Sequence, residues 1–144
     1  MAATTADQSG RVVLIALDGS DQSTYAFETY LKSLKYPDDV VLLVTCKELS
    51  KVEKLKTEEE TKKAMLKPYG DKLQEVGIKF KPLILVSQNP GYSIVNTAQA
   101  ENAGLIVMGS RGHGKLRRTL VGSCSDYVIN HTSAIPVVVC RQGS

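Results

Sequence analysis

The chain has 144 residues, of which 42% are hydrophobic and 23% are charged, and its formal net charge at pH 7 is +3. This length suits one ordinary globular domain, and the composition excludes a disordered, fibrous or collagen-like chain. The net charge is too small to indicate nucleic acid by itself, and every apolar run is far shorter than the ~20 residues that cross a bilayer.

The first ten residues, MAATTADQSG, have neither the basic nor the apolar region of a secretion signal. We therefore expect a disordered lead-in over 1–10, one domain over 11–144 and a cytoplasmic protein. The cysteines are Cys46, Cys124 and Cys140. Because their number is odd and no CxxC pair is present, we expect free thiols rather than a disulfide framework or a zinc site.

The first part of the chain predicts two buried strands with a helix between them. Residues 12–17, VVLIAL, form an apolar run that ends at Asp18-Gly19-Ser20, which is typical of a strand buried on both faces and followed by a turn. Residues 40–46, VVLLVTC, repeat this strand pattern. Between them, apolar residues recur at helical spacing before Pro37. These residues are Phe27, Tyr30, Leu31 and Leu34.

The middle of the chain predicts a charged helix and a third strand. The charged run after residue 46 is typical of a solvated loop and helix surface. Pro68 removes an amide donor and predicts a kink or a late helix start. Residues 78–86 have the pattern of a strand, in which Pro82 indicates a bulge or an edge position. The helical spacing before Gly77 is carried by Leu66, Tyr69, Leu73 and Val76.

The last part predicts two more strands and two more helices. A helix with Ile94, Val95 and Ala98 on one face and Gly104 as its C-cap precedes a strand at 105–108, LIVM. A helix over 123–132, with Val128 on its inner face, precedes a strand at 135–140, IPVVVC. Buried strands that alternate with helices predict an α/β fold, a parallel sheet covered on both faces, which binds ligands beyond the carboxyl ends of its strands.

The glycine-rich segment at 109–123, GSRGHGKLRRTLVGS, directly follows the predicted strand 105–108. The Walker pattern GxxxxGK[ST] fails at Leu116, where a hydroxyl should hold Mg²⁺, and the Rossmann pattern GxGxxG fails at Arg117. The pattern Gly-x2-Gly-x9-Gly-Ser/Thr is complete. It consists of Gly109, Gly112, Gly122 and Ser123.

This pattern suits an anion site. Glycines let the backbone pass close to a ribose and phosphates, and the free N–H groups of a helix that begins at Ser123 face an anion. The alternative interpretation is an ordinary surface loop with a helix cap at Ser123. Side chains that could cover phosphates lie between the glycines, and they are Arg111, His113, Lys115, Arg117 and Arg118.

Four segments resemble the universal stress protein family, specifically its ATP-binding branch, in order and spacing. They are VLIALDGS, LIVMGSRGHG, LVGSCSDYVINH and IPVVVCR, and the resemblance covers nearly the whole chain. It implies an α/β fold with a single doubly wound five-stranded parallel sheet of order 3-2-1-4-5 and helices on both faces. The domain over 11–144 would then be a nucleotide-binding domain.

The resemblance also implies an ATP site, with or without Mg²⁺, between the ends of strands one and four. Asp18 would bind the ribose, while Thr45 and Met108 would frame adenine through backbone contacts. Thr45 is more polar than the aliphatic residue often found there, and QNPGYS departs from the family's more acidic loop. Ribose and phosphates would be held by Gly109, Gly112, Gly122 and Ser123. Flanking contacts would come from Ala16, Arg111, His113 and Cys124.

The resemblance further implies a homodimer formed by antiparallel pairing of the last strands, through Val137, Val138 and Val139. We therefore expect an ATP-binding protein that acts as a nucleotide-dependent switch or binding module in stress response. Neither nucleic acid nor a membrane is expected as a partner.

Two alternatives stay open: a slow ATPase or nucleotide-transferring enzyme on the same fold, and a nucleotide-independent dimeric interaction protein. Phosphoryl transfer generally needs further acidic or polar groups besides Asp18. Asp126 and Asp21 are more simply explained as helix-start residues, which interact with the helix dipole. The two histidines, His113 and His131, make no metal cluster. The sequence therefore predicts no catalytic residue and no metal site.

Overall fold

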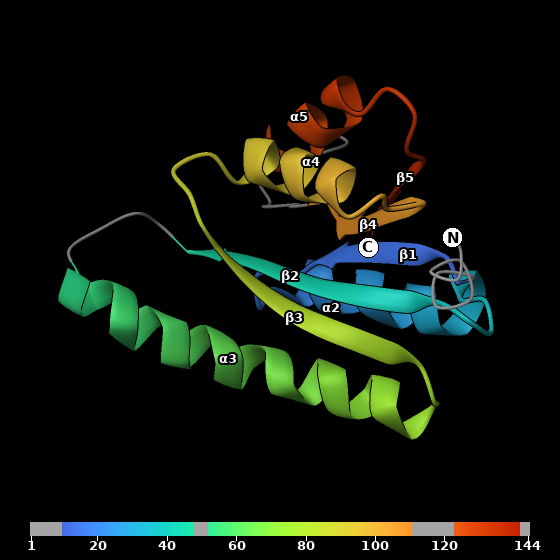
Figure 1. The fold of residues 1–144 in the computed structure, drawn as a ribbon, viewed down its shortest axis with the longest axis horizontal. Coiled ribbons are helices and arrows are strands. Elements are labelled where there is room, and N and C mark those ends of the chain that lie inside the picture. Colours follow the sequence, from blue (N-terminus) through green and yellow to red (C-terminus); the bar gives the residue numbers. More distant parts are fainter. Residues whose placement is uncertain (1–9, 48–51, 111–122, 142–144) are drawn as a thin grey trace, which may run out of the picture.

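The computed structural model describes residues 10–47, 52–110 and 123–141 and, outside residues 52–57, their side chains. Its strands form one parallel sheet of five strands in the order β3-β2-β1-β4-β5 (Figure 1), which confirms the predicted α/β class and strand order. The strands are β1 (Val12–Ala16), β2 (Val40–Lys47), β3 (Lys79–Val86), β4 (Leu105–Gly109) and β5 (Val137–Cys140).

Helices cover both faces of the sheet. In the described part of the chain, α2 (Asp21–Thr29) and α3 (Val52–Glu75) lie on one face, and α4 (Pro90–Ala100) and α5 (Ser123–His131) lie on the other (Figure 1). Side chains alternate between the two faces along a strand. Accordingly, Ile15 of β1 belongs to the core cluster of α2 and α3, whereas its neighbour Leu14 belongs to that of α4 and α5.

Helix α3 excludes one of the two outcomes predicted from Pro68, a late helix start. The helix begins at Val52 and continues through Pro68 to Glu75, so the proline does not delay its start. Leu66 and Leu73, on either side of the proline, are buried against the sheet, and this packing outweighs one lost backbone hydrogen bond. Val76, the last residue of the predicted helical spacing, lies beyond the end of the helix and is 50% exposed.

The end of helix α4 also differs from the sequence-based expectation. Gly104 was predicted as its C-cap, but α4 ends at Ala100, and Asn102 is the residue with a left-handed backbone, at φ 55°. Asn adopts this conformation more easily than most residues do. Gly104 instead donates its backbone N–H to the carbonyl of Val12 at 2.7 Å, which leads the chain into β4.

The amino end of the sheet is closed by a polar network centred on Asp39. Arg11 donates to both carboxylate oxygens of Asp39, at 3.0 and 2.8 Å, and the Tyr30 hydroxyl donates to Oδ2 at 2.6 Å. Oδ2 also accepts the backbone N–H of Tyr36 at 2.9 Å. Tyr30 begins a π-helical segment, η1 (Tyr30–Leu34), that continues α2. Asp39 is therefore buried with its hydrogen-bonding capacity filled.

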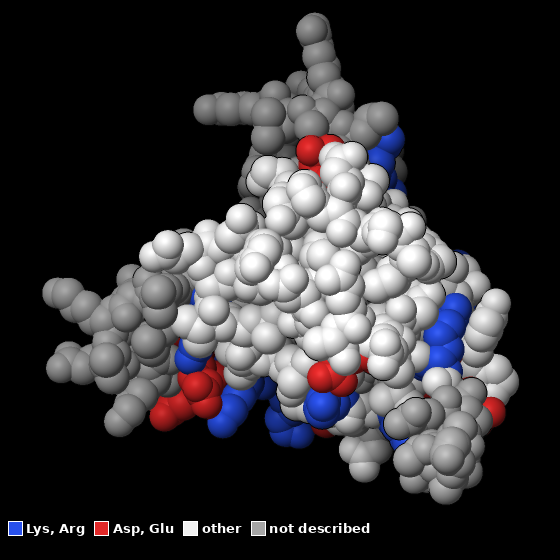
Figure 2. All heavy atoms as spheres, turned by 45° about the horizontal axis from the view of Figure 1, so that its top comes forward, with Lys and Arg blue, Asp and Glu red and all other residues white. Residues whose placement is uncertain are grey.

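Charge is distributed unevenly over the helices. Helix α3 carries many Lys and Glu residues, while α4 carries no charged residue and α5 carries one carboxylate, Asp126. Figure 2 shows that the centre of the face turned toward the viewer is almost free of Lys, Arg, Asp and Glu, which lie around its edges and most densely along the lower one. None of the described helices is both long enough and apolar enough to cross a membrane.

Candidate functional site

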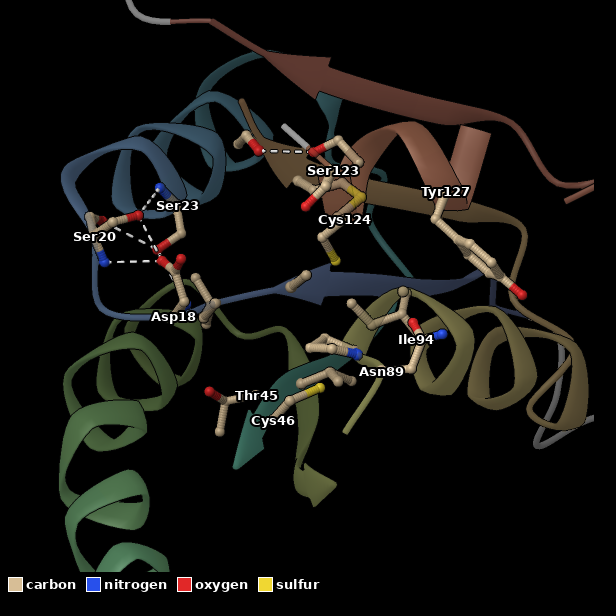
Figure 3. A pocket seen from close by; sticks show the side chains of 18 of the residues that line it. Asp18, Ser20, Ser23, Thr45, Cys46, Asn89, Ile94, Ser123, Cys124 and Tyr127 are labelled. Atoms are coloured by element: carbon tan, nitrogen blue, oxygen red, sulfur yellow. Dashed lines mark hydrogen bonds between the residues drawn. The ribbon is translucent and has the colours of Figure 1, made fainter. Parts of the chain in front are cut away.

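A cavity of about 530 Å³ opens at the carboxyl ends of β1, β2 and β4. The starts of α4 and α5 close it on one side (Figure 3). Helix α3 contributes one side chain, Lys62. Strand order reverses between β1 and β4, since β1 pairs with β2 on one edge and with β4 on the other. The cavity therefore lies where doubly wound sheets bind ligands.

The turn after β1 holds the Asp18 carboxylate in a fixed position. Asp18 Oδ1 accepts the backbone N–H of Ser20 at 2.9 Å and its hydroxyl at 2.5 Å. Ser20 is also the N-cap of α2, because its Oγ accepts the backbone N–H of Ser23 at 3.2 Å. Gly19 makes this turn possible with a left-handed backbone at φ 85°. Asp18 is exposed and lines the cavity.

Strand β2 extends further than β1, and hydrogen bonds reveal which of its peptide groups face each neighbour. Leu17 donates its N–H to the carbonyl of Val44 at 2.8 Å, so the peptide groups of Val44 face β1. Ser87 donates its N–H to the carbonyl of Lys47 at 2.9 Å, so those of Lys47 face β3. The direction alternates from one residue to the next along a strand.

The backbone groups of Cys46 consequently face the cavity. By this alternation the Thr45 peptide groups face β3, and those of Cys46 face the opposite side, toward β1. The last β1 residue paired to β2 is Ala16, so β1 has ended before it reaches Cys46. Within the described residues the N–H and C=O of Cys46 have no hydrogen-bond partner. The cavity wall thus offers one donor and one acceptor side by side.

The end of β4 explains Gly109 in a way that the sequence did not reveal. A Cβ atom at Gly109 would lie 2.4 Å from the backbone carbonyl oxygen of Gln22 in α2. Glycine is therefore required here for the contact between β4 and α2, whatever the cavity binds. The Gly109 carbonyl accepts the Ser125 hydroxyl at 3.2 Å, which ties the first turn of α5 to the end of β4.

Two thiols line the cavity from different elements, Cys46 from β2 and Cys124 from the first turn of α5 (Figure 3). Burial, together with the nearby Cys124, raises the pKa of the Cys46 thiol to about 11, against an opposing effect of Lys62. The Cys46 thiol is therefore protonated at neutral pH and a poor nucleophile. None of the three cysteines forms a disulfide, as predicted.

The α4 side of the cavity was missed by the sequence analysis. The Asn89 side chain caps α4 by accepting the backbone N–H of Tyr92 at 3.2 Å. Gly91 lets α4 approach α5, because a Cβ there would lie 2.9 Å from the Cβ of Tyr127. The turn sequence Asn89-Pro90-Gly91 signals a helix start, but contacts with Tyr127 depend on tertiary packing and have no sequence signal.

The cavity gathers seven of the eleven residues predicted to bind nucleotide. They are Ala16, Asp18, Thr45, Met108, Gly109, Ser123 and Cys124. The other four, Arg111, Gly112, His113 and Gly122, lie outside the described residues. Lining residues that the sequence did not single out include Ser23, Cys46, Lys62, Asn89 and Tyr127. Grouping in one cavity is consistent with the predicted nucleotide contacts, which remain predictions.

The described lining combines few charged side chains with backbone groups, hydroxyls and apolar walls. Its carboxylate is Asp18 and its cation is Lys62, and no described histidine lines it. In the described part of the chain, no group of three His, Cys, Asp or Glu side chains could hold a metal ion. Backbone donors, hydroxyls and apolar walls suit a flat, polar-edged ligand.

A doubly wound sheet with a cavity at its switch point defines a class of α/β ligand-binding proteins. Residues 10–141 match the family model described as the universal stress protein family. The chain belongs to this family, as its sequence motifs indicated.

Two relatives give the extent of the similarity. Universal stress protein MJ0577 of Methanocaldococcus jannaschii is 35% identical over 132 residues, which cover 92% of this chain and 67% of the relative. An uncharacterized protein of Schizosaccharomyces pombe is 28% identical over 139 residues, which cover 89% of this chain and 23% of the relative. The chain thus spans two thirds of the archaeal relative and about a quarter of the yeast one.

Solved structures share the fold. The structure of MJ0577 has a TM-score of 0.78 at 28% identity, over 93% of this chain and 97% of that one. An Arabidopsis thaliana universal stress protein family structure with AMP bound has a TM-score of 0.68 at 18% identity, over 93% of both chains. A universal stress protein in complex with cAMP has a TM-score of 0.67 at 20% identity, over 92% and 97%.

Proposed function

We propose that this universal stress protein binds an adenine nucleotide, ATP, in the cavity at the carboxyl end of its sheet. The observation that carries the proposal is the pair of unpartnered backbone groups of Cys46 in the cavity wall. Adenine offers an acceptor, N1, beside a donor, the N6 amino group, which complements an N–H beside a C=O. Guanine presents the reverse order at the same edge, so this wall favours adenine.

The other contacts follow from the residues that line the cavity. Asp18 is held by Ser20 and would accept a ribose hydroxyl, and Ala16 and Met108 would contact the base. Because the peptide groups of Thr45 face β3, the backbone contact with adenine would come from Cys46 and not from Thr45. Helix α5 begins at Ser123, and the backbone N–H groups of its first turn and the positive end of the helix dipole would suit phosphates.

Residues outside the described part complete the proposed phosphate contacts. Gly112 and Gly122 would let the backbone approach the phosphates, and Arg111 and His113 would cover them. Support for an adenine nucleotide comes also from the two structures of the same fold with AMP and cAMP. Mg²⁺ usually binds one or two carboxylates together with substrate phosphates. Among the described lining residues, Asp18 alone could contribute a carboxylate to Mg²⁺. The phosphates would therefore supply most of the ligands of the ion.

The proposed role is a nucleotide-dependent switch or binding module in the cytoplasm. Homodimers would form by antiparallel pairing of β5, whose residues Val137, Val138 and Val139 are partly exposed. Strand β5 pairs with β4 at one edge, and among the described strands nothing pairs with its other edge. An open apolar edge strand is an association hazard unless it is covered.

A nucleotide titration tests the proposal. At a hundred times its dissociation constant a ligand adds about 2.7 kcal/mol, which raises the melting temperature of a domain of this size by roughly 5–11 °C. We expect such a shift with ATP and a much smaller one with GTP. Asp18→Asn should reduce the ATP shift, whereas Asp71→Asn, an exposed change on α3, should not.

The outcomes separate the rival functions. No shift with any nucleotide would contradict nucleotide binding and favour the interaction protein, and equal shifts with ATP and GTP would contradict the role of the Cys46 backbone. Multiple-turnover phosphate release that Asp18→Ala abolishes without loss of ATP binding would favour the enzyme.

A further inference from the structure

The wall between β2 and α3 carries two polar side chains that the proposed ATP contacts leave without a counterpart. They are the hydroxyl of Thr45 and the ammonium group of Lys62, and both residues line the cavity. They come from separate elements of the fold. The structure gives neither of them a protein partner among the described residues.

Thr45 points towards α3. Val41 and Leu43 of β2 belong to the core cluster that contains Leu66 and Leu73 of α3, and Thr45 continues this alternation. Figure 3 shows its oxygen on the side of α3, away from Cys46 and Asn89. Thr45 is 2% exposed, and its Oγ1 has no hydrogen-bond partner. Buried hydroxyls are nearly always paired, and a carboxylate oxygen of α3, Oε1 of Glu58, is also buried without a partner among the described residues.

Lys62 differs from its neighbours on the charged side of the molecule. Lys63 pairs with Glu59, Lys67 pairs with Asp71, and even the buried Lys47 pairs with Glu59. Lys62 is half-buried and forms no ion pair with a described residue. It lies close enough to the Cys46 thiol to influence it electrostatically. A single unpaired ammonium group therefore reaches the β2 side of the cavity.

Lys62 also lies near the turn that holds Asp18. A Cβ on Gly19 would lie 3.7 Å from Cγ of Met65, so the β1–α2 turn touches α3 at Met65. Lys62 is three residues before Met65, and residues at this spacing are neighbours on one helix face. Lys62 is thus on the helix face that touches the β1–α2 turn, and it lines the same cavity as Asp18 in that turn.

We propose that Lys62 and Thr45 form a second anion subsite, which takes a phosphate on the 2′ or 3′ oxygen of the ribose of an adenine nucleotide. An ammonium group donates three hydrogen bonds and accepts none, and a threonine hydroxyl can donate one more, so the two together suit an oxyanion. This inference rests on the proposed adenine-nucleotide function. It adds a ligand class, ribose-phosphorylated adenine nucleotides, to that function.

Calorimetric titrations with three probes test the subsite. AMP, adenosine 3′,5′-bisphosphate and adenosine 2′,5′-bisphosphate share the base, the ribose and the 5′-phosphate. We expect one bisphosphate to bind at least tenfold more tightly than AMP, and the stronger of the two identifies the ribose oxygen. Lys62→Met should bring the ratio of bisphosphate to AMP affinity close to one, and Thr45→Val should lower it severalfold.

Lys63→Met is the matched control, because Lys63 is the adjacent, exposed lysine of the same helix, and it should keep the full ratio. If neither bisphosphate binds more tightly than AMP, or if the preference survives Lys62→Met, the subsite is wrong while adenine-nucleotide binding stands. If AMP, ATP and both bisphosphates all fail to bind, the proposed function and the subsite both fall.

Discussion

The two ends of the sheet differ in whether their buried polar groups have hydrogen-bond partners. At the amino end, Asp39 accepts four hydrogen bonds, from Arg11, Tyr30 and the backbone of Tyr36. At the carboxyl end, the Thr45 hydroxyl and the Cys46 peptide groups have no partner in the described structure. Saturated polar groups stabilise a fold, and unsaturated ones are available to a ligand. We therefore expect substitutions at the amino end to change mainly stability and substitutions at the carboxyl end to change mainly ligand binding.

Removal of the Asp39 carboxylate should have the largest effect. Asp39→Ala leaves Arg11 and the Tyr30 hydroxyl without their shared acceptor, and loss of one partner of a buried pair costs about 3 kcal/mol or more. Urea unfolding measures the loss in free energy. The neighbouring exposed change Asp38→Ala should stay within about 0.5 kcal/mol. Similar losses of unfolding free energy in Asp39→Ala and Asp38→Ala would contradict the stabilising role of the Asp39 network.

Gly109→Ala should come next, and it tests the carboxyl end. The new Cβ would meet the backbone carbonyl of Gln22 at 2.4 Å, and a backbone atom cannot move aside as a side chain can. Overpacking of this kind costs about 1–3 kcal/mol. Thermal unfolding measures it. An alanine variant as stable as the native protein would show that β4 and α2 separate easily, and that the glycine serves the ligand alone.

The pH dependence of the Asp39 network should be somewhat smaller. Burial alone would raise the pKa of Asp39, but hydrogen bonds from Arg11, Tyr30 and Tyr36 and the Arg11 charge outweigh it and lower the pKa. The ionised carboxylate therefore stabilises the fold above the unfolded pKa of about 3.9, and this contribution is lost as pH falls through the lower folded value.

Asp39→Asn isolates this effect. We expect it to cost about 1.5–3 kcal/mol at pH 7, the worth of hydrogen bonds to a charged group. The gap between native and variant stability should be constant from pH 7 to 5 and close only below about pH 4. Urea unfolding at several pH values measures it. A gap that closes already near pH 6 would mean that Asp39 is not the titrating group.

Ser20→Ala should have a moderate effect on stability and a second effect on binding. Loss of an N-cap costs about 1 kcal/mol, and Ser20 also hydrogen-bonds Asp18. We expect weaker ATP binding by calorimetry together with the loss in stability. The exposed serine of η1 provides the control, since Ser33→Ala should change neither quantity. Unchanged ATP affinity in Ser20→Ala would mean that the Ser20 N-cap stabilises α2 but does not contribute to ATP binding.

Thr45→Val should have the smallest effect on stability. The hydroxyl is buried without a partner, so its replacement by a methyl group removes an unsatisfied polar atom and should leave the free energy of unfolding unchanged or slightly higher. Urea unfolding without ligand measures it. A loss above 1 kcal/mol would mean that the hydroxyl has a partner in the free protein and is not kept for a ligand.

The sequence predicted the sheet well because its signals are local. Each strand is an apolar run of four or more residues, such as 40–46, and each helix keeps a regular apolar spacing. Predictions from single residues were less reliable. Gly104 does not cap α4, since Asn102 two residues earlier takes the left-handed conformation, and Pro68 lies within α3, since packing on both sides of it holds the helix.

Only part of the candidate site could be predicted from the sequence. Asp18 and Gly109 follow strands and carry recognisable turn signals, so they could be placed at the edge of the sheet. Lys62 could not, because its position depends on how α3 packs beside the β1–α2 turn, and one lysine in a charged helix has no distinguishing pattern. The proposed contact of the Cys46 backbone with adenine depends on β2 continuing past the end of β1. This is a property of strand register and not of the thiol side chain.

That difference in strand length has an evolutionary consequence. When a base is bound by the main chain, natural selection at position 46 acts first on backbone conformation, and the side chain needs only to fit the cavity wall that it lines. A lineage could exchange this cysteine for many other residues without loss of adenine recognition. Proline is the exception, because it has no N–H to donate.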